Sequence, residues 1–379
     1  MKRAVLLLAA ALGGCSEPAA SPAVCTEGCA SVALDPPILV LSSDLAQASA
    51  LGLVSTQGCF DARETDLALG GDATLSRASS RSFVSARGLG IVHEIDPVTL
   101  RILRTHAAST AAEAISPNPQ DVAIDENGRL WIVRYGLSSV GIIEADGTWG
   151  AAVDLSALAD TDGVPEMAAI QIVGGVAYVT LERLERSDGE SKATGPGLIA
   201  VIDVVSRAVE SFSLIGENPF GRMAPVLGEP SGTLVTVVTP GDFDAISPTD
   251  GIEQVDLARG ESTQLVSEVE LEGSPIAAIV AGPNEGYAIV AGPEPGLNPT
   301  KVVAFDPAAG KVTQTLADSR ASTEGFFHAD LAVSGGFLAV ADRTPGAARI
   351  RFFDRRTLEE TTAVCAKDHP PFSLIPAPP

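Results

Sequence analysis

Short apolar runs separated by turn residues dominate the chain from Ile38 onward. Each run is only a few residues long, is rich in Val, Ile, Leu and Ala, and is bounded by Gly, Pro, Asp, Asn or Ser. Such runs favour strands over helices, and no stretch repeats its apolar residues with a helical period. The pattern therefore predicts many short antiparallel strands and an all-β fold.

Two strand patterns alternate along the chain, and each occurs seven times. The first is an apolar run behind a glycine or serine turn, as in GRLWIVRYG, and the second ends on a turn aspartate, as in AFDPAAGKV. The aspartates of the second pattern are Asp61, Asp96, Asp146, Asp203, Asp256, Asp306 and Asp354. We expect each carboxylate to accept backbone N–H bonds within its own turn, which is a structural role.

A repeat of about 50 residues with several strands is typical of a β-propeller, because only neighbouring sheets can cover both apolar faces of each small sheet. Five units also show an innermost strand ahead of the first pattern, such as MAAIQIV. The first unit has no room for one, whereas the chain ends on the spare segment PPFSLIP. We therefore predict a seven-bladed β-propeller of four-stranded antiparallel blades over 38–379, with a ring closed by the C-terminal strand.

The strands AYVTLE and LIAVID resemble the YVTN-type, or YncE-like, seven-bladed propeller repeats of exported bacterial proteins. The resemblance spans 38–379. It implies the propeller fold but no single function, because propellers of this type include binding proteins, uncharacterised surface proteins and lactonase-like enzymes.

The first fifteen residues, MKRAVLLLAAALGGC, have the pattern of an export signal. A basic start at Lys2 and Arg3 precedes an apolar run that is too short to span a bilayer but fits the centre of a signal peptide. The ending LGGC resembles the bacterial lipobox, which implies a lipoprotein signal peptide over 1–14 and a diacylglycerol anchor on Cys15. An ordinary secretory signal, with a mature amino terminus elsewhere, is the alternative.

Residues 15–37 are small, polar and proline-rich, which is typical of a flexible tether between a membrane and a domain. In lipoproteins a serine after the lipidated cysteine, here Ser16, implies sorting to the outer membrane. We therefore expect a lipid-anchored protein of the cell envelope, either on the periplasmic side of the outer membrane or at the cell surface.

Composition argues against one class of partner. The chain has 48 acidic and 25 basic residues, and its formal net charge is −23. Because no basic surplus exists to displace counterions, we expect no nucleic-acid partner. We expect a monomer whose acidity keeps an apolar-rich chain soluble.

Four cysteines follow Cys15, namely Cys25, Cys29, Cys59 and Cys365. An even count in an exported protein predicts two disulfides, for which three pairings are possible. We favour Cys25 with Cys29 and Cys59 with Cys365, because the second bond would join the two ends of the ring. A zinc site is disfavoured, since no histidine lies near the first two cysteines in the sequence.

The long loops are expected to gather on one face of the ring. In four-stranded blades, the loops between second and third strands open on the same face as the links between blades. The long stretches of these two kinds are 107–120, 183–197, 240–251, 292–299 and 316–327. Because a scaffold tolerates extra length where no packing forbids it, this long-loop face is the predicted working surface.

Polar residues are expected at the inner rim of the long-loop face, where second strands end and innermost strands begin. The candidate ligand-binding residues are Arg87, Arg134, Tyr135, Glu182, Arg222, Asp342 and Arg343. Converging arginines in so acidic a protein favour a carboxylate or phosphate ligand. The structural alternative is that the arginines pair with Glu182, Asp342 and Asp330 inside a polar funnel.

Hydrolysis and metal binding have weaker candidates. His328 and Asp330 are the one histidine–carboxylate pair expected at the inner rim, but no G-x-S-x-G motif accompanies them. Candidate calcium ligands are Asp160, Asp162 and Glu166 in one loop and Asp242 and Asp244 in another. Neither loop follows the twelve-residue calcium pattern, so we predict no cofactor and keep Ca²⁺ as an alternative.

Together these features predict a lipid-anchored envelope propeller that binds an envelope protein or a small anionic ligand through its long-loop face, without catalysis. The alternative is a lactonase-like or other hydrolase with an acidic, metal-assisted funnel around His328 and Asp330.

Overall fold

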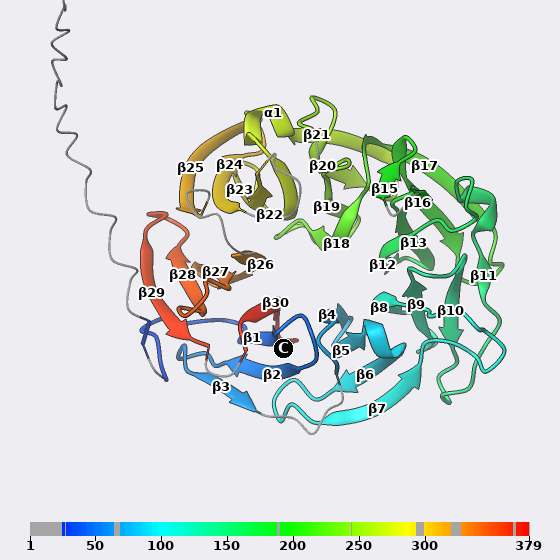
Figure 1. The fold of residues 1–379 in the computed structure, drawn as a ribbon, viewed down its shortest axis with the longest axis horizontal. Coiled ribbons are helices and arrows are strands. Elements are labelled where there is room, and N and C mark those ends of the chain that lie inside the picture. Colours follow the sequence, from blue (N-terminus) through cyan, green and yellow to red (C-terminus); the bar gives the residue numbers. More distant parts are fainter. Residues whose placement is uncertain are drawn as a thin grey trace, which may run out of the picture.

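Seven four-stranded antiparallel sheets surround a central channel in a computed structural model of the protein (Figure 1). The structure describes residues 25–26, 28–63, 69–187, 190–243, 245–292, 299–319, 327–366 and 369–378. The predicted seven-bladed propeller is confirmed. The predicted lipidation site Cys15 lies outside the described residues. No helix in the described ranges is long and apolar enough to cross a membrane.

The first four blades, each given from its innermost to its outermost strand, have the following bounds. Blade 1 contains β30 (Pro371–Pro376), β1 (Ile38–Ser43), β2 (Ser49–Val54) and β3 (Phe60–Arg63). Blade 2 contains β4 (Ala73–Ala78), β5 (Arg81–Ala86), β6 (Ile91–Ile95) and β7 (Ile102–Ala107). Blade 3 contains β8 (Pro119–Ile124), β9 (Leu130–Arg134), β10 (Ser139–Ile143) and β11 (Val153–Asp154). Blade 4 contains β12 (Met167–Val173), β13 (Val176–Leu181), β16 (Pro196–Asp203) and β17 (Val209–Glu217).

The last three blades repeat this order. Blade 5 contains β18 (Phe220–Pro225), β19 (Leu234–Thr239), β20 (Gly251–Asp256) and β21 (Glu261–Ser267). Blade 6 contains β22 (Ser274–Gly282), β23 (Glu285–Ala291), β24 (Thr300–Asp306) and β25 (Lys311–Asp318). Blade 7 contains β26 (His328–Ser334), β27 (Phe337–Asp342), β28 (Arg349–Asp354) and β29 (Glu360–Cys365). The elements outside the blades are the hairpin β14 (Leu184–Ser187) and β15 (Glu190–Ala193), the helix α1 (Glu268–Leu271) and the 3-10 turns η1 (Arg87–Leu89) and η2 (Ser156–Leu158).

The apolar runs form the middle strands of the blades, which are buried on both faces. In β9 every residue is buried, and Val133 packs with Val179 and Ile202 of the next blade in one apolar cluster. Because each sheet covers its neighbours in this way, near-continuous apolar runs replace the strict alternation of a half-exposed strand. The core is therefore a set of layers between blades.

Six of the seven predicted turn aspartates hold the hairpin between the third and fourth strands of a blade. In blade 2, Oδ1 of Asp96 accepts from the backbone N–H groups of Val98 and Thr99 at 2.8 and 2.9 Å. Asp146, Asp203, Asp256, Asp306 and Asp354 accept backbone N–H bonds in the same way. Asp61 is the exception and the prediction for it is wrong, because it lies within the outermost strand β3 and the turn before it is held by Ser55.

The C-terminal strand closes the ring as predicted. Strand β30 pairs antiparallel with β1 from Ile38↔Pro376 to Ser42↔Pro371 and takes the innermost position of blade 1. The innermost strand of blade 2 was not anticipated. It is β4, whose sequence ATLSRA interrupts the apolar run with polar residues.

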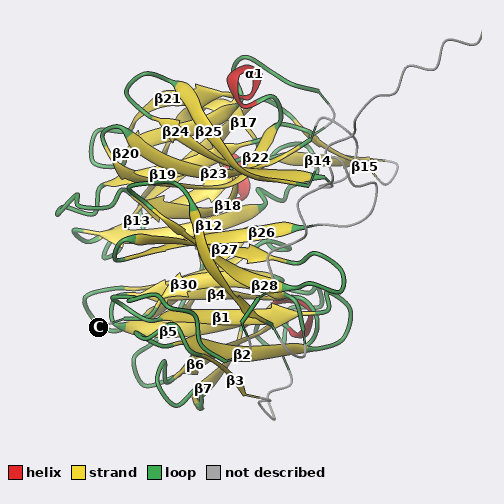
Figure 2. Cartoon of the chain, turned by 90° about the vertical axis from the view of Figure 1, so that its left-hand side faces the viewer, coloured by secondary structure: helices red, strands yellow, loops and turns green. Residues whose placement is uncertain are grey.

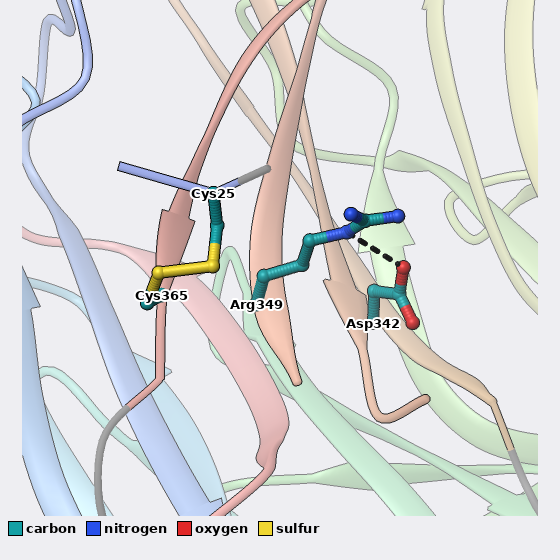
Figure 3. The surroundings of a disulfide bond; sticks show 4 residues. All are labelled: Cys25, Asp342, Arg349 and Cys365. Carbon is teal, nitrogen blue, oxygen red and sulfur yellow. Dashed lines mark hydrogen bonds and ion pairs between the residues drawn. A yellow bond between two sulfur atoms is a disulfide. The ribbon is translucent and has the colours of Figure 1, made fainter. Parts of the chain in front are cut away.

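Two disulfides form, as predicted, but their connectivity is not the one favoured above. Cys25 is bonded to Cys365, beside the Asp342–Arg349 ion pair on the neighbouring strands (Figure 3), and Cys29 is bonded to Cys59. The favoured pairing fails because Cys59 directly precedes β3 at one face of the ring, whereas β29 ends at Cys365 at the other.

The second half of the predicted tether packs on the ring. Ala30, Val32 and Leu34 are buried in one cluster with residues of blades 1 and 7, and N–H of Ala30 donates to the carbonyl of Gly58 at 2.9 Å. Residues 28–37 therefore cover the seam where the ring closes.

The two faces of the ring differ as the loop lengths predict. The long-loop face carries the links 108–118 and 155–166, the β14–β15 hairpin and the loop 240–250. The opposite face, termed the hairpin face, carries the short turns that include the six aspartates. Figure 2 shows the ring edge-on, with the β14–β15 hairpin at the right and the C terminus at the left.

Candidate functional site

The central channel contains two adjoining cavities. The wider one, termed the channel cavity, has a volume of about 680 Å³ and is lined by the innermost strands of all seven blades. It extends to the hairpin face, where Ser79, Leu227 and Pro376 line it. A narrower cavity of about 160 Å³ lies toward the long-loop face. Ser76, Asp121, Arg222 and Leu331 line both cavities and so mark the boundary between them.

The wall of the channel cavity is suited to an apolar ligand with polar groups. The aliphatic lining residues that are not fully buried between blades are Ile124, Ile172, Leu227 and Ile279. Each innermost strand also ends its sheet, so the unpaired N–H and C=O groups of its free edge face the channel. Cavities of several hundred Å³ that combine apolar walls with a few polar groups are typical of small-molecule sites.

Three charged residues line the channel cavity, and two of them are arginines. Arg222 lies at its inner end, where the side chain is 34% exposed, and Arg77 is exposed near the hairpin face. The third is Asp121, whose carboxylate accepts the backbone N–H groups of Val122 and Ile170 at 2.9 and 3.0 Å. The charged lining is therefore more basic than the chain as a whole.

Arg222 is held in place by bonds to blades 1 and 7. Its Nη1 donates to the carbonyl of Leu374 at 3.0 Å, and its Nη2 donates to the carbonyl of Leu331 at 2.9 Å and to Asp330. This ion pair is the one that the structural alternative anticipated. The guanidinium nevertheless borders both cavities, so a ligand in the channel can reach it.

The two aspartates at the inner end of the channel cavity are desolvated. Burial raises the pKa of Asp330 against the opposing effect of Arg222, and burial likewise raises the pKa of Asp121. The ion pair with Arg222 acts in the opposite direction and favours the charged form of Asp330.

His328 and Asp330 do not form the pair that a hydrolase would need. Nδ1 of His328 lies 2.8 Å from Oγ1 of Thr300 in blade 6, whereas Asp330 accepts from Leu374 N–H at 2.8 Å and from Arg222. The pairing of β26 with β27 is irregular between His328 and Leu331. His328 is 2% exposed, and burial lowers its pKa to about 4.

Three of the other candidate ligand-binding residues are buried, and their side chains form hydrogen bonds or ion pairs with other residues of the protein. Arg134 is fully buried and donates to Glu113 at 2.7 Å and to Ser139. Arg343 donates to the carbonyls of Ser43 and Pro370, and so ties blade 7 to blade 1. Asp342 pairs with Arg349 at 3.2 Å. Arg87, which lines the narrower cavity, pairs with Asp72 and donates to Gln120 at 3.0 Å.

Tyr135 and Glu182 meet at the long-loop face, below the β14–β15 hairpin. The Tyr135 hydroxyl donates to Oε2 of Glu182 at 2.8 Å, and the guanidinium of Arg186 in β14 lies 5.0 Å from the centre of the tyrosine ring. Burial raises the pKa of Glu182 to about 8 and that of the neighbouring Glu166 to about 7. These contacts join blades 3 and 4 to the hairpin.

The candidate metal ligands mainly hold loops. Oε2 of Glu166 accepts from Leu184 N–H at 3.0 Å, and Oδ1 of Asp242 accepts from Ala193 N–H at 2.6 Å, so both anchor the β14–β15 hairpin. Asp160 accepts from the N–H of Asp162 at 3.1 Å. Asp244 lies outside the described residues. Within the described ranges, no group of three or more His, Cys, Asp or Glu side chains is placed to hold a metal ion.

Sequence reasoning missed Arg77 and Ser76 as channel residues. Both belong to β4, the one innermost strand that was not recognised. The repeat could have predicted β4. In the other units an innermost strand lies one turn before the second strand, so one was to be expected before SSRSFVSAR.

No protein-family model matches the sequence, and no curated protein matches it. Solved structures do match. Hydrazine synthase of Kuenenia stuttgartiensis has a TM-score of 0.56 at 17% identity, with 83% of this chain and 92% of that chain covered. AztD of Citrobacter koseri has a TM-score of 0.55 at 13% identity, with 90% and 97% covered. Streptogramin B lyase has a TM-score of 0.53 at 10% identity, with 80% and 86% covered.

These likenesses establish the fold. At such low identity they carry no residue-level correspondence, and the matched proteins themselves include a synthase and a lyase. The channel is the feature of this chain that points to a function.

Proposed function

We propose that the protein is a lipid-anchored module of the cell envelope that binds a small anionic ligand with an apolar body in its central channel, without catalysis. The anchor is the one implied by the lipobox resemblance at Cys15. The module is of the YncE-like kind that the strand repeats resemble. The proposed ligand site is the channel cavity.

One observation supports this function above others. In a chain of net charge −23, a cavity of about 680 Å³ combines aliphatic side chains with polar groups in its wall, and two of its three charged lining residues are arginines. An apolar body can occupy the wall region while a carboxylate or phosphate reaches Arg222 at the inner end. Guanidinium groups bind such oxyanions with charge-assisted hydrogen bonds.

The ligand site proposed here is in the channel, whereas the loop lengths predicted a site on the long-loop face. The wider cavity extends to the hairpin face, and most candidate arginines of the long-loop rim already have internal partners. The hydrolase alternative lacks comparable support, because His328 and Asp330 form hydrogen bonds with different blades.

Isothermal titration with three ligands of equal chain length, namely decanoate, decyl phosphate and decylammonium, tests the proposal. We expect the two anions to bind and the cation not to bind. A charge-assisted hydrogen bond contributes about 1.5–3 kcal/mol, so Arg222→Gln is expected to weaken anion binding by roughly 10- to 100-fold. Arg222→Lys keeps the charge and is expected to restore part of that loss.

Two further variants separate binding from folding. Arg77→Gln alters an exposed side chain near the mouth of the cavity and is expected to weaken binding by a smaller factor than Arg222→Gln. Arg104→Gln, on the outermost strand β7, is the matched control and is expected to bind like the natural protein. Anion binding that is unchanged in both Arg222 variants, or no binding of any anion, would contradict the channel site.

A further inference from the structure

Arg77 carries the second guanidinium that lines the channel cavity. It belongs to β4 in blade 2, whereas Arg222 belongs to β18 in blade 5. Both residues line the wider cavity, but only Arg222 also lines the narrower one. Arg222 therefore lies at the inner end of the channel cavity, and Arg77 lies closer to its mouth.

The guanidinium of Arg77 is held near the hairpin face. Its Nε donates to the carbonyl of Ser79 at 3.2 Å, and Ser79 lies in the turn that follows β4. Ser76 marks the boundary with the narrower cavity. A strand rises about 3.3 Å per residue, so Ser79 lies about 10 Å further along the chain from that boundary. The two guanidinium groups are therefore at different depths in the cavity.

Carboxylates are absent from the mouth of the cavity, as far as its described lining residues show. Asp121 is the one acidic residue among them, and it also lines the narrower cavity, so it lies at the inner end. Within the described ranges Arg77 forms no ion pair, whereas Arg222 pairs with Asp330. The positive charge at the mouth can therefore be neutralised by a ligand.

An apolar stretch of wall separates the two depths. Ile124 and Ile172 are partly exposed, and they line the wider cavity but not the narrower one. Such side chains favour contact with the methylene groups of a ligand, because both apolar surfaces leave water. A linear hydrocarbon chain along this wall would extend from Arg222 toward Arg77.

We propose that the ligand of the channel is a linear dianion, in which an apolar chain carries a carboxylate or phosphate at each end. One end binds Arg222 at the inner end of the cavity, and the other binds Arg77 near the mouth. This inference rests on the channel site of the proposed function and specifies its ligand class. Sebacate, the ten-carbon dicarboxylate, is long enough to reach both groups, whereas the six-carbon adipate is too short.

Isothermal titration with sebacate and with its monomethyl ester tests the second contact. The two ligands have the same carbon chain, but the ester carries one charge instead of two. An exposed ion pair contributes only a modest free energy, so we expect sebacate to bind roughly 2- to 5-fold more tightly than the ester. In Arg77→Gln the two affinities are expected to become equal, whereas Arg77→Lys keeps the charge and should keep most of the difference.

Adipate with its monomethyl ester, and the variant Arg104→Gln, are the controls. Adipate is expected to show no preference over its ester, and Arg104→Gln is expected to keep the full preference for sebacate. Equal binding of sebacate and its ester, a preference that persists in Arg77→Gln, or an equal preference for adipate would overturn the dianion but not the channel site. Failure of every anion to bind would instead overturn the channel site.

Discussion

Burial and hydrogen bonding decide what each candidate arginine can do. All three arginines bond to the protein itself, but Arg134 and Arg343 are only 0 and 8% exposed, whereas the Arg222 side chain is 34% exposed and borders the channel. Sequence placed all of them at the inner rim, and it could not separate them, because the partners of Arg134 come from positions 21 residues back and 5 residues on. The residue type indicates that an arginine can bind an anion, but its contacts in the fold determine whether it is available to do so.

Replacement of Arg134 tests the structural role. Arg134→Gln removes the bonds to Glu113 and Ser139, so Oε1 of Glu113 loses the guanidinium and only Oε2 keeps its bonds from Thr110. We expect a loss of roughly 3 kcal/mol in the free energy of unfolding, measured by urea denaturation. A loss below about 1 kcal/mol, similar to that expected for Arg104→Gln, would be evidence against this role.

Glu182 provides a prediction about pH. Burial raises its pKa from an ordinary value of 4.5 to about 8 in the folded protein. The folded state therefore keeps a proton that the unfolded chain has lost, so this stabilisation is fully present below pH 4.5 and disappears as the pH rises through 8.

The matched variant is Glu182→Gln, whose carbonyl can still accept from the Tyr135 hydroxyl. Between pH 5 and 8 the thermal midpoint of the natural protein is expected to fall more steeply than that of the variant. Identical slopes in calorimetric scans across this range would argue against a buried, protonated Glu182.

The strands follow from local sequence, and their exceptions have local causes. Apolar runs, turn aspartates and glycine turns predicted most of the third strands and five innermost strands. Strand β4 was missed because Ser76 and Arg77, which both line the channel, interrupt its apolar pattern. A strand that lines the channel can contain polar residues. It therefore lacks the continuous apolar run by which a strand buried between two blades is recognised.

Closure by β30 can be tested at one side chain. Leu374 is fully buried between blades 1 and 7, and its backbone N–H bonds to Asp330. Leu374→Ala is expected to lower the free energy of unfolding by about 2–5 kcal/mol. Leu103→Ala, at an exposed position on β7, serves as the control and is expected to change it by less than about 0.5 kcal/mol. Equal effects would show that the C-terminal strand does not close the ring.

At the scale of the whole molecule, the repeat count predicted the ring and its closure. The connectivity of the disulfides could not be predicted from the positions of the cysteines in the sequence. The favoured bond between Cys59 and Cys365 assumed that the two chain ends meet at one face. Cys25 instead bonds to Cys365 at the long-loop face, whereas Cys29 bonds to Cys59 at the hairpin face, and residues 30–37 run along that face to the start of β1. Composition alone described this segment as a tether.

The Cys25–Cys365 bond should stabilise the whole ring. It links the N-terminal segment to blade 7, with a separation of 340 residues. Cys25→Ser with Cys365→Ser is expected to lower the free energy of unfolding by roughly 2–5 kcal/mol. Urea denaturation without reductant measures this loss. An unchanged midpoint, together with intact Cys29–Cys59, would contradict a stabilising role.

The central claim is that a small anion with an apolar body occupies the channel. A crystal structure grown with saturating decanoate tests it most directly. The account predicts electron density for the alkyl chain within the channel cavity and the carboxylate within hydrogen-bonding distance of Arg222. Decanoate bound on the long-loop face, or a channel that contains only water at saturating ligand, would contradict it.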